Sequence, residues 1–254
     1  MRKVYLVIIW TITLACIVFG SMRFTGHFTP FDGPTKKGSQ SLEGTLNSIE
    51  LNGVAFDVTI QKGNENKVSY RSKYKPEISL VNGRLTIKEH TSKRRFFFAR
   101  ALAVTITVKD DLDTITLNSK QGDIDIKSIK AKNMMIETKA GDIDIADCEV
   151  ENLFVDTKAG DIDITRGNIQ NIKVESSAGD IDCDRTLFTT LKCNLLAGDC
   201  DIKGQEDLSD YSYNLEVKFG DLEVNGTSYS KRYVKEGSAK RIDIEVKAGD
   251  IDIS

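Results

Sequence analysis

Pairs of carboxylates recur in the second half of the chain, where Gly-Asp is followed by Ile-Asp-Ile or a close variant. Carboxylate oxygens are the ligands that Ca²⁺ prefers, and a pair of carboxylates is the usual catalytic apparatus of glycoside hydrolases. The motif begins at Gly122, Gly141, Gly160, Gly179, Gly198, Gly220 and Gly249. The first five glycines are 19 residues apart, and the last two follow after 22 and 29 residues.

Calcium binding is the weaker interpretation of these acids. A calcium site between coils would use the acids of three successive motifs: Asp142, Asp144, Asp161, Asp163, Asp180 and Asp182. Parallel coils that bind Ca²⁺ have a nine-residue period with several glycines, whereas this motif has one glycine in 19 residues. We therefore expect no metal site and keep calcium as an alternative.

Catalysis requires an asymmetric set of groups, and the repeat does not supply one. The acids recur identically, so no pair is distinguished as acid and base. His27 and His90 are the only histidines, and both lie outside the repeats, which leaves no Ser-His-Asp, Cys-His or His-rich metal arrangement. We expect no catalytic residue and no cofactor, so the protein is not an enzyme. A carbohydrate-active β-helix enzyme is the least favoured alternative.

A fixed period of this length predicts stacked coils, each of which buries its apolar side on its neighbours. Within one repeat, Ile172 and Val174 alternate with polar residues, and Ile181 follows the Gly179-Asp180 pair. This alternation is typical of strands with one buried face, and a glycine at each motif marks a structural turn. The sequence therefore predicts an all-β, single-domain β-solenoid, similar to a parallel β-helix, with 19-residue coils of two to three short strands.

Stacking places the acids in two columns. The corner column comprises Asp123, Asp142, Asp161, Asp180, Asp199, Asp221 and Asp250. The outer-face column comprises Asp125, Asp144, Asp163, Asp182, Asp201, Glu223 and Asp252. Like charges one coil apart repel each other. We expect compensation from a lysine column (Lys120, Lys139, Lys158, Lys218 and Lys247) and from backbone amides of each aspartate's own corner.

Cysteines replace aliphatic residues at several core positions. Cys183, Cys193 and Cys200 stand where other repeats have Ile, Val or Leu, so we interpret them as small apolar core residues. A diagonal disulfide between Cys183 and Cys200 on adjacent coils is an alternative. No partner is evident for Cys148, and Cys16 lies in the N-terminal apolar segment.

Residues 4–22 contain no charged side chain and are about long enough to cross a bilayer as a helix. Arg2 and Lys3 precede them, which favours a cytoplasmic N-terminus and an extracytoplasmic remainder. A cleaved signal peptide and a lipoprotein signal at Cys16 are the alternatives. We predict a single-pass protein of the cell membrane, in which residues 1–22 are a transmembrane anchor or signal-anchor and contact the membrane through this N-terminal helix.

The remaining chain divides by composition. Residues 23–44 contain scattered Gly and Pro, which indicates a linker, and residues 45–254 form the solenoid. Within it, residues 45–110 are irregular first coils that cover one edge, and residues 111–254 carry the repeats. The long step between Gly220 and Gly249 contains Asn225-Gly226, which favours a hairpin.

A basic aromatic stretch interrupts the alternation of the first coils. It comprises Lys93, Arg94, Arg95, Phe96, Phe97, Phe98 and Arg100. Aromatic and basic residues together are typical of a contact with the membrane surface. The alternative is a loop that folds over the first coil, with the phenylalanines as an end cap.

The chain ends at Ser254, directly after a complete motif and without a polar cap. An uncapped solenoid end is an exposed edge, so we expect a homodimer or partner contact through the C-terminal edge. The net charge of −3 gives no basic footprint for nucleic acid.

The N-terminal apolar segment, the strand at residues 104–108 and the repeated Ala-Gly-Asp-Ile-Asp-Ile together resemble a bacterial family. This is the family of putative-adhesin domains with β-strand repeats and unknown function, which includes a Lia-type envelope-stress protein. The resemblance covers roughly residues 45–254. It implies an adhesin-like or cell-envelope binding role, with a cell-wall polymer or an envelope protein as partner. The alternative is a structural or regulatory envelope-stress component that acts through a membrane partner.

Overall fold

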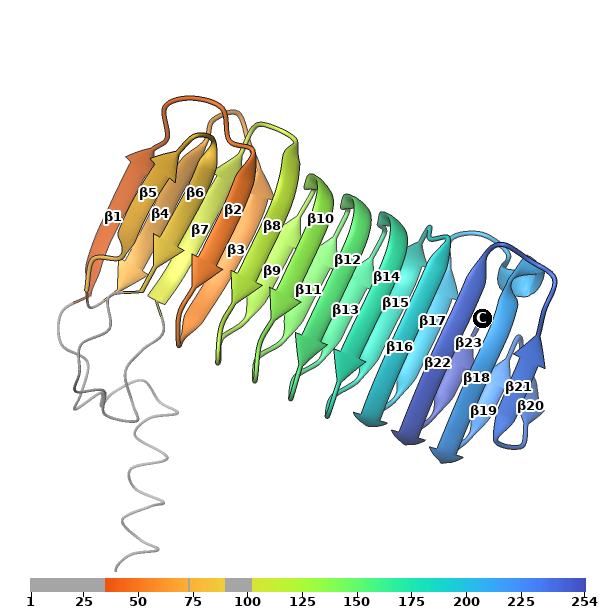
Figure 1. Ribbon diagram of the computed structural model, residues 1–254. Helices are drawn as coiled ribbons and strands as arrows, with labels where there is room; N and C mark the ends of the chain where they lie inside the picture. The colour runs from red at the N-terminus through yellow and green to blue at the C-terminus, as the bar shows by residue number, and fades with distance from the viewer. Residues whose placement is uncertain (1–34, 73, 90–101) are drawn as a thin grey trace, which may run out of the picture.

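The computed structural model describes residues 35–72, 74–89 and 102–254. These residues form two β-sheets packed face to face in one elongated stack (Figure 1). Among them, no helix is long and apolar enough to cross a membrane. Residues 4–22, on which the anchor was predicted, and the basic aromatic stretch lie outside the described residues.

The first sheet, sheet A, contains twelve strands. In spatial order they are β1 (Lys36–Ser41), β4 (Lys67–Ser72), β7 (Leu102–Val108), β3 (Phe56–Lys62), β9 (Ile124–Lys127), β11 (Ile143–Ala146), β13 (Ile162–Thr165), β15 (Ile181–Thr186), β17 (Cys200–Gly204), β23 (Ile251–Ile253), β19 (Leu222–Val224) and β20 (Thr227–Tyr229).

The second sheet, sheet B, contains eleven strands. In spatial order they are β21 (Arg232–Lys235), β18 (Ser212–Phe219), β22 (Arg241–Ala248), β16 (Thr190–Ala197), β14 (Asn168–Ser176), β12 (Glu149–Thr157), β10 (Lys130–Glu137), β8 (Leu112–Asn118), β2 (Ser48–Asn52), β6 (Arg84–Lys88) and β5 (Glu77–Val81). A single 3₁₀ turn, Leu208–Asp210, precedes β18 in the described chain.

Each regular coil consists of one sheet B strand, a glycine corner, one sheet A strand and a second corner. Neighbouring coils pair in parallel and in register, so that Ile143, Ile162 and Ile181 form one column. Their side chains are buried between the sheets, whereas Asp163 beside them faces outward. The predicted β-solenoid is confirmed, with two strands per coil.

The glycine corners bring the backbones of successive coils very close together. Gly160 has a φ of +122°, and a Cβ at this position would lie 2.2 Å from the carbonyl oxygen of Gly141. The same close approach recurs from Gly122 to Gly249 along the stack. Only glycine combines this φ with this spacing, so the glycines are structural turns, as predicted.

The aspartate after each glycine binds the next corner. The amide of Asp161 donates to Oδ1 of Asp142 at 3.0 Å, and the amide of Asp180 donates to Oδ1 of Asp161 at 2.9 Å. The ladder continues through the corners in the order Asp123, Asp142, Asp161, Asp180, Asp199, Asp250 and Asp221. The acceptor therefore serves the neighbouring coil and not, as we expected, its own corner.

The last coil in sequence is not the last coil in space. The coil of β22 and β23 lies between the coil of β16 and β17 and the coil of β18 and β19. Antiparallel strands β20 and β21 cover the outer edge instead. The expectation that the coil ending at Ser254 forms an exposed edge is therefore wrong. A homodimer contact at this end of the solenoid stays a prediction, but the position of Ser254 no longer supports it.

The opposite end has the same interleaved arrangement. The coil of β2 and β3 lies between the coil of β6 and β7 and the coil of β8 and β9. Antiparallel β5, β4 and β1 cover this edge. Strand β1 lies within residues 23–44, so the structure corrects the linker boundary there.

The predicted hairpin after Gly220 is confirmed. Strands β19 and β20 pair antiparallel around Asn225 and Gly226, which have φ values of +51° and +72°. Two consecutive positive φ angles are the geometry of a type I′ turn.

Gly160→Ala should lower the free energy of unfolding by about 3 kcal/mol, because the added methyl group meets the Gly141 carbonyl and the φ is strained. Gly237→Ala is the matched control, since Gly237 has a φ of +124° but nothing within 4 Å of the place that a Cβ would occupy. We expect the control to lose only about 1 kcal/mol in urea unfolding. Equal losses would show that the close approach of the coils is unimportant.

Asp161→Ala should cost about 1 kcal/mol, because the amide of Asp180 loses its acceptor. Asp161→Asn keeps an Oδ1 acceptor at the same place and should stay within about 0.5 kcal/mol of the parent. Urea titrations of both variants measure the difference. If Asn costs as much as Ala, the carboxylate charge and not the hydrogen bond is what the corner requires.

Candidate binding face

The acids proposed as the calcium alternative are divided between two environments. Asp142, Asp161 and Asp180 lie in the corner ladder, where Oδ1 already accepts a backbone amide. Their partners Asp144, Asp163 and Asp182 are stacked on the outer face of sheet A. In the parts of the chain that the structure describes, no group of three or more His, Cys, Asp or Glu side chains is placed to hold a metal ion.

Stacking of like charges perturbs the outer acidic column. Partial burial, followed by the charges of Asp144 and Asp182, raises the pKa of Asp163. Burial, followed by the charges of Asp182 and Asp252, likewise raises the pKa of Asp201. The column therefore destabilises the fold when it is fully ionised.

The expected lysine compensation does not reach the corner acids in the structure. Lys158 Nζ lies 3.3 Å from Oδ1 of Asp156, two residues earlier, and the Lys218 ammonium lies 5.7 Å from the centroid of the Phe219 ring. The corner aspartates instead accept backbone amides. The lysine column is thus a feature of sheet B and its edge, not a counter-charge for the corner.

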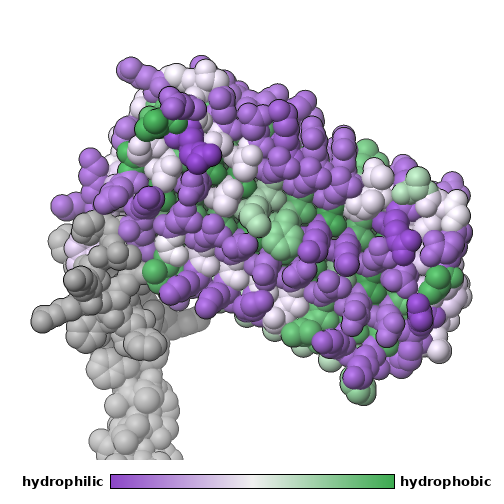
Figure 2. Space-filling model, viewed as in Figure 1, coloured by the Kyte–Doolittle hydropathy of each residue, from purple (hydrophilic) through white to green (hydrophobic). Residues whose placement is uncertain are grey.

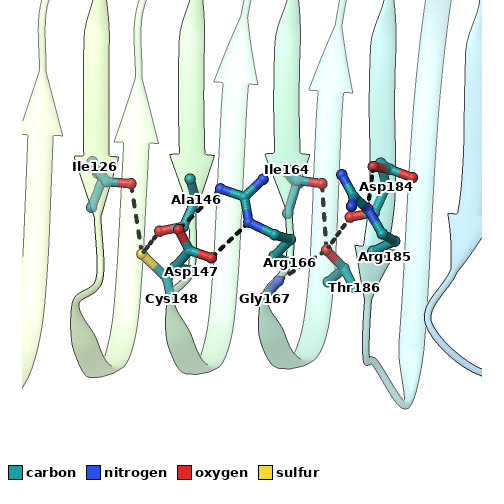
Figure 3. A network of polar contacts seen from close by, with 10 residues as sticks. All are labelled: Ile126, Ala146, Asp147, Cys148, Ile164, Arg166, Gly167, Asp184, Arg185 and Thr186. Carbon is teal, nitrogen blue, oxygen red and sulfur yellow. Dashed lines mark hydrogen bonds and ion pairs between the residues drawn. The ribbon is translucent and has the colours of Figure 1, made fainter.

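The second corner, opposite the glycines, uses residues that we did not identify from the sequence. Ser128, Asp147, Arg166 and Arg185 have φ values from +48° to +56°. Arg166 donates to both carboxylate oxygens of Asp147 at 2.8 and 3.0 Å, across one coil step (Figure 3). Hydrogen bonding from Arg166 lowers the pKa of Asp147.

Buried side chains close the same corner from inside. The Cys148 thiol donates to the carbonyl oxygen of Ala146 at 3.3 Å, and Thr186 Oγ1 accepts the amide of Gly167 at 3.2 Å (Figure 3). Burial raises the pKa of Cys148 to about 11, so its thiol stays protonated and unreactive. These groups satisfy the backbone of the turn and form no catalytic arrangement.

The outer face of sheet B carries a ladder of amides. Nδ2 of Asn152 donates to Oδ1 of Asn133, and Nδ2 of Asn171 donates to Oδ1 of Asn152, both at 3.0 Å. Thr190 Oγ1 continues the ladder by donating to Oδ1 of Asn171 at 2.8 Å. An Asn side chain has two donors and two acceptor positions, and the ladder uses one of each at Asn152. The row therefore keeps hydrogen-bonding capacity toward solvent.

A shallow hollow of about 380 Å³ lies beside this ladder. Met135 and the half-buried Phe154 occupy neighbouring positions in one column, which Lys173 and Lys192 continue. Met135 is 39% exposed, and the Lys173 ammonium lies 4.9 Å from the centroid of the Phe154 ring. Figure 2 shows the corresponding apolar patch near the middle of this face, within a hydrophilic surround.

The hollow continues toward the C-terminal coils with a change in chemistry. A second depression of about 340 Å³ shares Lys192 with the first and is lined by charged residues, including the Arg241–Asp243 ion pair at 2.8 Å. An acidic column that includes Asp156 and Glu175 borders the first hollow. The face thus combines an apolar track, a row of amides and basic side chains that include Lys173 and Arg241, each paired with an acid of its own strand.

The sequence contains a signal for this face that we did not use. Asn133, Asn152 and Asn171 recur at the same 19-residue step as the glycines. The repeat pattern therefore contained the amide row, although Met135 and Phe154 stand at positions without a common residue type.

Asp163→Asn should stabilise the protein at neutral pH by a few tenths of a kcal/mol, because it removes one charge from the column. The folded-state pKa of Asp163 is raised, so the native state binds the proton more tightly and the charge destabilises above that pKa. The advantage of the variant should therefore disappear as the pH falls through the carboxyl range. Thermal unfolding of both proteins across pH measures this difference.

Glu175→Gln is the control, for which we expect the opposite change in stability at neutral pH. Hydrogen bonding from Lys173 lowers the pKa of Glu175, so its charge stabilises the fold above the unfolded-state pKa. The control should melt below the parent at neutral pH and converge with it in acid. A parent and Asp163→Asn variant with identical melting temperatures at every pH would contradict the repulsive column.

Solved structures of proteins from several bacteria are similar to this chain. One, described as a putative adhesin from Bacteroides fragilis, is 11% identical and has a TM-score of 0.51. The match covers 88% of this chain and 98% of the Bacteroides fragilis chain. A putative cell adhesion protein from Clostridium sporogenes is 14% identical with a TM-score of 0.41, covering 87% of this chain and 99% of its own. A putative lipid binding protein from Parabacteroides distasonis is 12% identical with a TM-score of 0.44, covering 88% and 98%.

At such low identity the first of these shows the fold alone, and the other two carry no argument. No curated protein matches this chain. The Toastrack DUF4097 family matches in two overlapping segments, residues 46–214 and 106–254, which together span most of the chain. With its in-register coils and glycine corners, the chain belongs to the Toastrack DUF4097 family.

Proposed function

We propose that this protein is a non-catalytic, membrane-anchored binding protein of the cell envelope whose solenoid holds a carbohydrate polymer on the outer face of sheet B. The hollow beside the amide ladder carries this proposal. Residues 4–22 would anchor the chain, with the solenoid on the extracytoplasmic side.

The chemistry of the hollow suits sugars better than it suits other polymers. A sugar ring presents an apolar C–H face and a rim of hydroxyl groups. Phe154 and Met135 offer apolar surface, and Asn133 and Asn152 lie beside them with polar groups that can donate to and accept from hydroxyls. The bordering acids Asp156 and Glu175 oppose a strongly anionic polymer.

The repetition of the site favours a polymer over a single small molecule. The amide ladder advances one residue per coil, at the spacing of neighbouring strands, about 4.8 Å. A chain of repeating units can then contact several coils at once, and weak contacts add through avidity. The description of the structurally similar Bacteroides fragilis protein as a putative adhesin agrees with a binding role.

A regulatory envelope-stress role is the alternative, with the membrane contact made by Lys93, Arg94, Arg95, Phe96, Phe97, Phe98 and Arg100. It predicts binding to anionic vesicles. A carbohydrate-active enzyme remains the least favoured alternative, because the acids of this chain repeat without a distinguished pair.

The test is co-sedimentation of residues 35–254 with lipid-free cell walls and, in parallel, with anionic vesicles. These residues contain the whole described core, and circular dichroism confirms that each sample is folded. We expect saturable wall binding that weakens at least tenfold in the Met135→Ser, Phe154→Ser double variant, since two apolar contacts are lost.

Phe219→Ser is the matched control, because Phe219 is an aromatic side chain that is 67% exposed at the end of β18, outside the hollow. It should bind walls as the parent does. Equal loss in both variants, or binding to vesicles but not to walls, would exclude the proposed face. Release of soluble sugar from the walls would instead support the enzyme.

A further inference from the structure

Two cysteines face each other across the core of one coil. Cys193 lies on β16 in sheet B and Cys200 lies on β17 in sheet A, on either side of the Gly198 corner. Their sulfur atoms are 3.7 Å apart, and the two side chains are 1% and 0% exposed. Both are free thiols in the structure.

The same two positions are aliphatic in the other regular coils. By register and sequence the equivalent pairs are Leu117 and Ile124, Ile136 and Ile143, Val155 and Ile162, Val174 and Ile181, Ile244 and Ile251, and Leu215 and Leu222. A single cysteine at such a position is adequately explained as a small core residue. In this coil both members of one facing pair are cysteines, Cys193 and Cys200. The two positions therefore differ from the aliphatic pattern together and not singly.

We propose that Cys193 and Cys200 are a disulfide site that joins the two sheets within one coil. To bond, the sulfur atoms must approach from 3.7 Å to about 2.05 Å. The two cysteines already point toward each other across the core beside the Gly198 corner, so the movement that brings the sulfur atoms together is confined to one coil.

The diagonal alternative between Cys183 and Cys200 fits the structure less well. Cys200 pairs in register with Ile181, and Cys183 pairs with Ile202, so the two cysteines are offset by two residues on adjacent strands. Strand spacing and rise place such diagonal neighbours roughly 8 Å apart, beyond the Cα separation that a disulfide allows.

The reaction is thiol–disulfide exchange with a disulfide oxidant, either a small molecule of the glutathione class or an oxidoreductase. One cysteine thiolate attacks the oxidant to form a mixed disulfide and releases a thiol, and the second thiolate then displaces the other thiol. The two cysteines together lose two protons and two electrons, and the oxidant gains them.

The bond must form before the core closes. In the folded chain neither sulfur is accessible, and hydrogen bonding with Cys193 together with burial raises the pKa of Cys200. Once formed, the bond is shielded from reductants by the same burial. This chemistry suits an oxidising compartment such as the extracytoplasmic side proposed above, although the refolding experiment does not depend on location.

The test refolds the reduced, denatured full chain in a buffer of oxidised and reduced glutathione, then alkylates all free thiols under denaturing conditions. Trypsin cleaves after Lys192 and Lys203, so both cysteines fall in one peptide, residues 193–203. We expect this peptide to lack alkyl groups and to weigh two hydrogens less than the dithiol. Cys183, in the peptide of residues 174–185, should be alkylated.

The bond should also raise the melting temperature by roughly 5 °C relative to the chain refolded in excess reductant. The reason is that a bond between Cys193 and Cys200 closes a loop and so lowers the conformational entropy of the unfolded state. Cys193→Ala and Cys200→Ala should lose this redox dependence, whereas Cys183→Ala should keep it. A doubly alkylated 193–203 peptide after oxidative refolding, or a cross-link to the 174–185 peptide, would overturn the proposal.

Discussion

The close approach of successive glycine corners is the constraint on which the rest of this structure depends. A carbonyl oxygen occupies the place where a Cβ would stand on the next coil, and the aspartate that follows each glycine binds the amide of the neighbouring corner. Both contacts can be made in only one register. A shift by one residue would bury the outward acids and expose the isoleucines, so the corner and the core select the same alignment. That agreement explains why a motif of five residues is sufficient to specify a stack of coils.

The same register destabilises the outer face of sheet A, where like charges are stacked, and stabilises the amide row on the outer face of sheet B. Because every column aligns like with like, sheet A brings seven carboxylates together, from Asp125 to Glu223, and burial and mutual repulsion raise the pKa values of Asp163 and Asp201. Uncharged amides gain from the alignment that penalises acids, since each Asn can donate to the one before it. The amide row of sheet B therefore tolerates repetition better than the acidic column of sheet A, and a repeating binding surface can form along this row at lower electrostatic cost.

The sequence was sufficient for the features that repeat and insufficient for those that do not. The period, the glycine corners and the inward columns followed from spacing alone, and the Asn225-Gly226 turn followed from its residue types. The second corner was missed because residues as different as Ser128 and Arg166 adopt the same positive φ there. The amide row was visible in the spacing, but the hollow beside it depends on Met135 and Phe154, whose column changes from apolar to basic along the stack.

The order of the end coils could not be predicted from the sequence, because a repeat carries no information about which neighbour it stacks on. Each corner is compatible with any other, and the ladder accepts Asp250 after Asp199 and Asp221 after Asp250 without distortion. The antiparallel strands that cover the outer edge decide the stacking order. Strands β20 and β21 return antiparallel to the outer coil, and the remaining chain then fits only into the space left beside β16 and β17. The C-terminal coil is thereby paired on both sides, so fraying from Ser254 would require breaking two ladders at once. Since the opposite end is interleaved in the same way, the proposed binding face on sheet B lies between two ends that are each paired on both sides. Contacts of this face with a long ligand would not incur the ordering cost of a flexible surface.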